Sequence, residues 1–137
     1  MTIDRQRYLG LAGFRYALRR FLAASEVLSH AAGVTAQQYQ AMLSIGVAER
    51  PPAMKDLAEE LLLQPHAAVQ MVDRLQKLGL VTRQTSPDDR RSVLLALTPH
   101  GETLLDGLAA RHLDEMLKQE PLLTLALERL RLAGEKR

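Results

Sequence analysis

The chain contains no cysteine among its 137 residues, and this absence excludes several classes of site. Disulfide bridges, thiolate–zinc centres and thiol redox sensors all require that residue. Aromatic residues make up only 4% of the chain, so we expect a core built from Leu, Ala, Val and Met. Because no apolar run is long enough to cross a bilayer, we expect no membrane span.

Strong charge of one sign is also missing. The formal net charge is +2, which is too small by itself to indicate nucleic-acid binding, although the pI of about 9.2 permits it. The first ten residues, MTIDRQRYLG, lack the apolar segment of a secretory signal, so we expect a cytoplasmic protein. The length suits one domain, or one domain with helical extensions.

Catalytic motifs are equally scarce. The sequence shows no glycine-rich phosphate loop and no nucleophile motif. His112 and Glu115 form one pair at helical spacing, and His100 and Glu102 do not complete a typical metal-ligand motif. We therefore expect neither an enzyme nor a bound metal or cofactor.

Most of the chain shows apolar residues at helical spacing. Gly33 marks the end of a long first helix, because glycine accepts the left-handed conformation that often follows a helix. Thr35 and Gln38 have the spacing of a capping box at the start of the second helix. The expected helices span about residues 8–28, 36–48, 55–62, 65–78 and 99–119, followed by a short helix from Pro121.

Two strands are expected at residues 80–85 and 92–98, where aliphatic and β-branched side chains flank the turn SPDDRR. The predicted order is α-α-α-α-β-β-α-α, a mainly α (α+β) fold. Two short helices followed by a hairpin indicate a winged helix-turn-helix. We expect residues 35–98 to form a DNA-binding lobe, integrated in one domain with a helical dimerisation region from residues 1–34 and 99–137.

The helix that begins at Pro65 should enter the major groove, since it is the second helix of the pair. Asp73 is expected to brace an arginine, because a carboxylate repels phosphate. For any single polar residue here, a solvated surface position is the alternative. The positions expected to face inward are Ala68, Val72, Leu75 and Leu78, and the expected DNA contacts are His66, Ala67, Gln70, Arg74 and Lys77.

The segment from Met54 to Gly101 resembles the DNA-binding core of the multiple antibiotic resistance regulator (MarR) family. The resemblance is carried by VDRLQKLGLV, by the wing sequence SPDDRR and by LALTPHG. It implies a homodimer in which the N- and C-terminal helices intertwine. It also implies binding to a pseudo-palindromic operator, usually as a repressor that a small ligand releases.

The resemblance assigns roles to the wing as well. Arg91 matches the family's arginine that enters the minor groove, and Asp89 matches the acid that orients it. We expect Arg83 and Arg90 to add wing contacts to DNA, the latter to phosphate. Asp88 is expected to favour the turn through its side-chain oxygen.

Two features depart from the family pattern. A small hydroxyl residue is common where His66 stands, which leaves open a changed base preference or a contact made only by the protonated ring. The lack of cysteine removes the thiol oxidation that peroxide-sensing relatives use. As in the family, an effector pocket is expected between the dimerisation helices and the DNA-binding lobe. Its candidate lining residues are Tyr8, Phe14, Arg15, Tyr16 and Tyr39, and packing in the core or in an interface is the alternative for the aromatic ones.

The leucine-rich chain ends support a dimer independently, because PLLTLALERLRL offers more apolar surface than a small winged domain can easily cover. Packing of these helices within one chain is the alternative. The expected partners are double-stranded DNA, a second copy of the chain and a small-molecule effector. A winged helix used only for protein contact is the competing function, although it does not need a basic wing tip. The expected dimerisation residues are Leu11, Phe14, Leu18, Leu122, Leu125 and Leu130.

Overall fold

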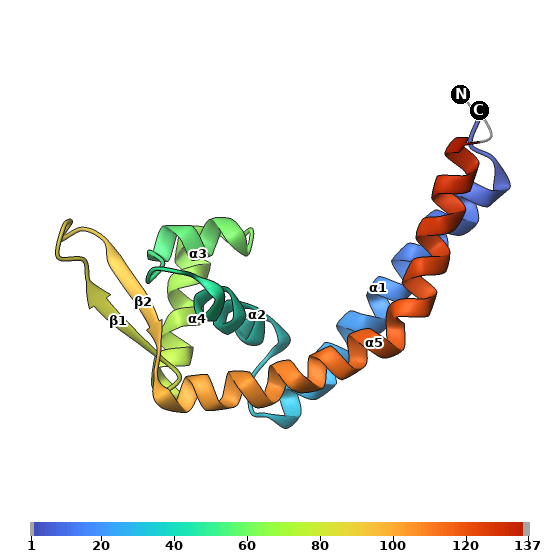
Figure 1. The fold of residues 1–137 in the computed structure, drawn as a ribbon. Coiled ribbons are helices and arrows are strands. Elements are labelled where there is room, and N and C mark those ends of the chain that lie inside the picture. The colour runs from blue at the N-terminus through green and yellow to red at the C-terminus, as the bar shows by residue number, and fades with distance from the viewer. Residues whose placement is uncertain (1, 136–137) are drawn as a thin grey trace. The chain divides into compact units, whose positions relative to one another are not determined.

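A computed structural model of the chain describes residues 2–135. These residues form two compact units. The helical unit comprises the residues up to 28 and those from 110 onward, and the winged unit comprises residues 29–109. The elements are α1 (Arg5–Ala31), α2 (Ala36–Val47), α3 (Met54–Glu60), α4 (Pro65–Lys77), β1 (Val81–Thr85), β2 (Val93–Leu97) and α5 (Pro99–Glu135) (Figure 1).

The predicted fold class is confirmed, since the chain is mainly helical with one two-stranded antiparallel hairpin. The predicted break between the last two helices is wrong, because α5 continues through Pro121. That proline cannot donate a helical hydrogen bond. Residues beyond it still pack on α1, where Ala126 is buried and Leu130 lies against Gly10, and this packing favours continuation of the helix.

The winged unit is organised around helices whose ends follow the sequence signals. The capping box at α2 is confirmed: Oγ1 of Thr35 accepts from the Gln38 N–H at 3.0 Å, and Oε1 of Gln38 accepts from the Thr35 N–H at 2.9 Å. The core of this unit includes the fully buried side chains of Met42, Leu57 and Leu75. This packing presents α3 and α4 as the two helices of a helix-turn-helix.

One predicted core position of α4 is wrong. Leu78 is 47% exposed, while Met71 is buried together with Ala68, Val72 and Leu75. Leu78 caps the C-terminus of the helix, and the chain turns away at Gly79, which has a φ of +75°. The inward stripe therefore ends one turn earlier than the periodicity predicts.

The hairpin continues from this turn, with β1 and β2 paired from Val81 opposite Leu97 to Thr85 opposite Val93. Its base is fixed to the rest of the unit because the Leu95 N–H donates to the carbonyl oxygen of Pro52 at 2.9 Å. Leu95 itself is fully buried. The hairpin projects from the helices of the winged unit, as Figure 1 shows.

A tight junction joins this hairpin base to the start of α5. Oγ1 of Thr98 accepts from the Gly101 N–H at 2.9 Å and donates to the carbonyl oxygen of Gly79 at 2.6 Å. The Thr98 N–H donates to the carbonyl oxygen of Leu80 at 3.0 Å. A Cβ at Gly101 would lie only 2.1 Å from that same oxygen, so the junction requires glycine.

The turn between α3 and α4 contains a leucine in a left-handed conformation. Leu62 has a φ of +56°, and its side chain is 92% exposed. The Leu62 N–H donates to Glu59 at 3.2 Å and the Leu63 N–H donates to Ala58 at 2.9 Å, as in a Schellman motif. Glycine is usual at this position, because it has no Cβ to clash with the backbone.

Leu62→Gly is expected to stabilise the protein by up to about 1 kcal/mol. Relief of left-handed strain outweighs the larger entropy of the unfolded glycine chain, and little buried surface is lost. Urea unfolding followed by circular dichroism measures the change. Leu61→Gly is the control, since Leu61 has an ordinary φ of −87° and its replacement should destabilise. Equal destabilisation by both changes would contradict the assignment of strain to Leu62.

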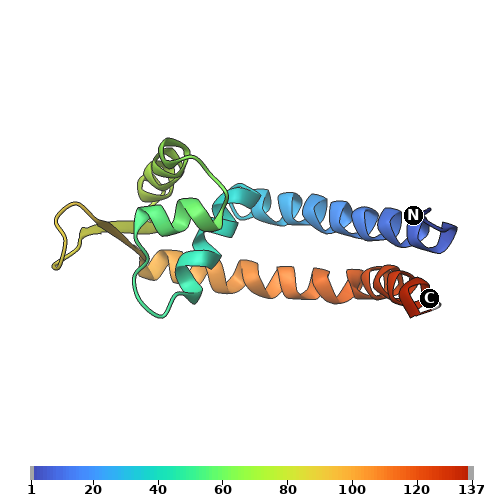
Figure 2. The same ribbon diagram turned by 90° about the horizontal axis from the view of Figure 1, so that it is seen from above.

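In the helical unit, α1 and the later part of α5 run antiparallel, as Figure 2 shows. A Cβ at Gly10 would lie 2.7 Å from Cγ of Leu130, so the helices approach closely there. Nearer the other end, Oγ of Ser25 and Nε2 of His112 lie 2.7 Å apart, and both residues are buried. None of the helices within residues 2–135 combines the length and apolarity that a membrane crossing requires.

Candidate nucleic-acid interface

The wing tip is an ordered turn held by side chains. Oγ of Ser86 accepts from the N–H groups of Asp88 and Asp89, each at 3.3 Å, and Oδ1 of Asp89 accepts from the Arg91 N–H at 2.9 Å. The Ser92 N–H closes the turn on the carbonyl oxygen of Asp89 at 3.0 Å. Side-chain hydrogen bonds from Ser86 and Asp89 therefore shape the turn, in place of the predicted contribution of Asp88, and Asp89 holds the backbone of Arg91.

The outward face of α4 presents the residues that the sequence predicts for base contact. The side chains of His66, Gln70, Arg74 and Lys77 are exposed, and Ala67 is half-buried. Val69 is 39% exposed beside them. This face offers hydrogen-bonding groups and small apolar groups together, as a helix in the major groove requires.

Asp73 braces an arginine, as predicted, and that arginine is Arg83. The guanidinium Nη2 of Arg83 donates to Oδ1 of Asp73 and, at 3.3 Å, to the carbonyl oxygen of Val69. The pairing was not predicted, although the strand alternation places Arg83 on the same face as buried Val81. A cation on the inward face of a strand signals a partner on the packed helix.

A cavity of about 440 Å³, here called the wing–helix cavity, lies between residues 91–93 at the tip end of β2, the helix α3 and the N-terminal part of α4. Its lining includes Lys55 from α3, Pro65 and Val69 from α4, and Arg91 from the wing. Lys55 was not among the predicted contacts. Its position in the first turn of α3 is a signal, because a cation there opposes the helix dipole and is not placed for helix stability.

Several acids around these elements are already bonded. Oδ2 of Asp56 accepts from the Ala53 N–H at 3.0 Å, Asp89 accepts from the wing backbone, and Asp73 holds Arg83. Within residues 2–135, by contrast, a group of exposed cations has no side-chain hydrogen bond or ion pair to the protein. These are Lys55, Arg74, Lys77, Arg90 and Arg91.

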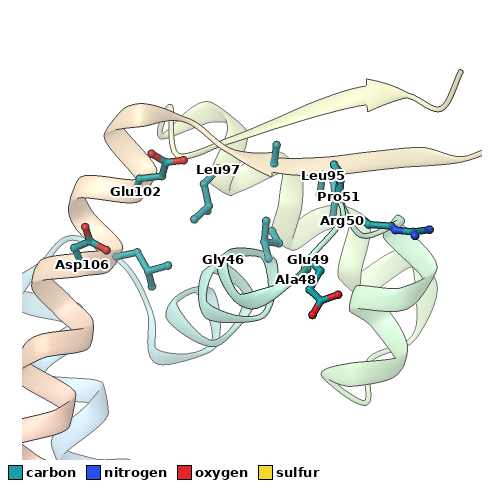
Figure 3. Close-up of a pocket in the computed structure, with 12 residues that line it drawn as sticks. Gly46, Ala48, Glu49, Arg50, Pro51, Leu95, Leu97, Glu102 and Asp106 are labelled. Atoms are coloured by element: carbon teal, nitrogen blue, oxygen red, sulfur yellow. The ribbon is translucent and has the colours of Figure 1, made fainter.

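A second cavity in the winged unit has the opposite character. It measures about 410 Å³ and lies between the end of α2, the strand β2 and the first turns of α5. Glu102 and Asp106 stand on its α5 side, and Leu97 points into it from β2 (Figure 3). The carboxylates that line this second cavity outnumber its one cation, and they disfavour phosphate. The wing–helix cavity is lined by two cations and one carboxylate, so it is the better match to DNA.

The residues predicted to line an effector pocket belong to both units and differ in how exposed they are. In the helical unit, Tyr8 and Arg15 are exposed, and the hydroxyl of Tyr16 accepts from Nη1 of Arg20 at 3.0 Å. In the winged unit, Tyr39 is 7% exposed, and burial raises the pKa of its hydroxyl. For Tyr39, this burial supports the alternative of core packing.

The helical unit carries an apolar groove of about 400 Å³ between α1 and α5, here called the helical-unit groove. Phe14 and Leu18, both predicted for dimerisation, line it, whereas the predicted Leu130 packs on Gly10 of its own chain. Leu11, Leu122 and Leu125 are 40–50% exposed. The other lining residues are Ala17, Phe21, Leu113, Met116, Leu117, Gln119, Glu120 and Leu123.

Comparison with known proteins gives consistent matches. A family model described as the MarR family matches residues 32–92. The uncharacterized HTH-type transcriptional regulator YhbI of Bacillus subtilis is 37% identical over 87 residues, which cover 64% of this chain and 56% of that protein. The match therefore spans little more than half of that curated relative's length. YhbI is named as a transcriptional regulator, in agreement with the prediction that this chain is not an enzyme.

Solved structures extend the likeness. A cysteine-to-serine mutant of MarR from E. coli, complexed with operator DNA, has a TM-score of 0.67 and 25% identity, covering 77% of this chain and 74% of its own. CouR from Rhodococcus jostii RHA1, bound to p-coumaroyl-CoA, has a TM-score of 0.68 and 26% identity, covering 75% of this chain and 72% of its own.

Proposed function

The chain belongs to the MarR family, and we propose on this basis that it is a transcriptional regulator that binds a pseudo-palindromic DNA operator as a homodimer. The observation that carries the proposal is the set of exposed cations around α4 and the wing that have no side-chain partner among the residues that the structure describes. The operator-bound structure of the E. coli MarR mutant supports it.

In this proposal α4 lies in the major groove, where Gln70 suits an adenine edge and Arg74 suits guanine or phosphate. Arg91 enters the adjacent minor groove, whose negative potential is strongest over A·T tracts. Lys55 and Arg90 contact phosphates beside these two grooves. The ordered backbone around Asp89 supports this placement, because it fixes the point from which the Arg91 side chain extends.

Arg91→Ala is expected to weaken operator binding by about 1–3 kcal/mol, since it removes the minor-groove contact. Fluorescence anisotropy with a footprinted operator fragment measures the loss over a series of salt concentrations. The wild-type affinity should fall steeply with salt as counterions are released. Arg19→Ala is the matched control, because it removes the same charge from an exposed position on α1.

Equal affinity of the Arg91 and Arg19 variants for the operator would contradict the wing contact. Salt-insensitive binding to a protein, with no affinity for the DNA near its own gene, would favour the protein-interaction module over the regulator.

The partner subunit is a second copy of this chain. An apolar groove flanked by exposed Leu113, Met116 and Leu117 leaves a large hydrophobic area in water, as monomeric proteins rarely do. Two such grooves meeting across a two-fold axis cover one another, because the same patch serves both subunits. The half-sites are then about one helical turn of DNA apart.

We also propose that this regulator is a repressor released by a small ligand. The CouR complex with p-coumaroyl-CoA supports ligand binding in this fold family. Phe14, Arg15 and Tyr16 are our candidates from the helical unit. A screen of aromatic acids for displacement of the bound operator tests this proposal. Charge reversal at Arg15 should weaken the binding of any acid that the screen finds.

A further inference from the structure

We propose that Arg83 is a positioning residue that holds the wing at a fixed angle to α4, and that it does not contact DNA. This inference rests on the proposed DNA-binding function and deepens it. It also revises the role that the sequence suggests for Arg83, which was grouped with Arg90 and Arg91. The three arginines differ in what their side chains already bind.

The contacts of Arg83 span one turn of the recognition helix. Nη2 donates both to the carbonyl oxygen of Val69, at 3.3 Å, and to the carboxylate of Asp73, four residues later. A carbonyl and a carboxylate one turn apart on the same side of a helix form a two-point acceptor. The strand is therefore tied to α4 at two places along the helix axis.

The environment of the pair sets it apart from a phosphate contact. The side chains of Arg83 and Asp73 are 30% and 45% exposed, and Nε of Arg83 is buried without a hydrogen-bond partner. An ion pair of zero net charge does not neutralise a phosphate, so it releases no counterion from the DNA. By contrast, Arg90 and Arg91 are exposed, with no side-chain partner within residues 2–135.

The location of Arg83 explains why such a tie is useful. It is the middle residue of β1, between the base of the hairpin and the tip that carries Arg91. A two-stranded ribbon is marginally stable by itself and bends easily. The tie to Asp73 limits that bending, so that α4 and Arg91 meet adjacent grooves in one register.

Asp73→Asn distinguishes a positioning role of Arg83 from a DNA contact, because the two roles predict opposite changes in operator affinity. If Arg83 holds the wing, losing the carboxylate loosens the tie and weakens operator binding, by roughly 3- to 30-fold on the scale of coupled hydrogen-bond networks. If Arg83 binds phosphate, the change frees its guanidinium and removes a repulsive charge, so affinity rises. Asp88→Asn is the control, since it removes the same charge from the exposed wing tip. It should leave affinity unchanged or raise it.

Salt dependence gives a second readout. Each phosphate contact contributes about 0.9 to the slope of log affinity against log salt concentration. We expect Arg83→Ala to lower affinity while keeping the wild-type slope, whereas Arg90→Ala should reduce the slope by about one contact. Arg83→Lys should lower affinity partly, because an ammonium is more strongly hydrated than a guanidinium and is therefore less suited to a partly buried ion pair.

A double-mutant cycle completes the test with the full-length protein. Once Arg83 is alanine, Arg91→Ala should cost less than it does in the wild type, because a loosened wing places Arg91 poorly. If the two residues made independent DNA contacts, the losses in binding free energy of the single variants would instead add up in the double variant. Additive losses, a slope reduced by Arg83→Ala, or tighter binding by Asp73→Asn would each overturn the proposal. Thermal unfolding of every variant confirms that the measured fraction is folded.

Discussion

Gly101→Ala should destabilise the winged unit by at least the roughly 1–3 kcal/mol that overpacking a core usually costs. The new Cβ would lie 2.1 Å from the carbonyl oxygen of Leu80 and 3.0 Å from its carbonyl carbon, and these backbone atoms cannot rotate away. Either α5 or the start of β1 has to move. Such a move also strains the two hydrogen bonds that Thr98 makes at this junction.

Gly107→Ala is the matched control on the same helix. Apart from its chain neighbours and the adjacent backbone of its own helix, no atom of the described residues lies within 4 Å of a Cβ built at Gly107. The change should therefore stabilise by up to about 1 kcal/mol through helix propensity. Urea unfolding monitored by circular dichroism measures both variants. Equal stability of the two variants would show that the close contact with Leu80 does not destabilise the protein.

Leu117→Glu should convert the protein from a dimer into a monomer and lower its operator affinity by about 10²–10⁴-fold. Leu117 is 65% exposed in the single chain and lines the helical-unit groove, which we propose the second copy covers. A carboxylate buried there without a partner costs several kcal/mol, and two-fold symmetry places one in each subunit. The affinity loss follows because two half-sites are no longer bound together.

Sedimentation velocity at micromolar concentration measures the assembly against the chain mass of 15.3 kDa. Val47→Glu is the control, because Val47 is 68% exposed but belongs to the winged unit, outside the groove. It should remain dimeric. If Leu117→Glu forms a dimer of normal stability, the interface lies outside the helical-unit groove. If the wild type sediments as a monomer, the proposed dimer does not exist.

The sequence predicts the fold where local chemistry decides the outcome. Thr35 and Gln38 cap a helix through atoms three residues apart, and the hairpin strands follow from β-branched and aliphatic runs. The continuation of α5 through Pro121 could not be predicted this way. Local propensity favours a break there, whereas the packing of Ala126 and Leu130 on α1 is a tertiary effect.

The same distinction applies to the candidate site. The outward face of α4 follows from helical periodicity, and the exposed positions agree with it. The pairing of Arg83 with Asp73 depends on how a strand packs against a helix, which periodicity alone does not specify. Lys55 was not predicted, because it lines the same cavity as Arg91 only once α3 and the wing, which are distant in the sequence, pack together.

The hydrogen-bonded wing tip has a thermodynamic consequence for association. Fixing the backbone of one flexible residue costs roughly 1–2 kcal/mol in conformational entropy. Because Ser86 and Asp89 already order the turn, much of that loss accompanies folding and does not recur when the wing meets DNA. Calorimetry should therefore show a smaller unfavourable binding entropy for the wild type than for Ser86→Ala, whose free wing is more disordered.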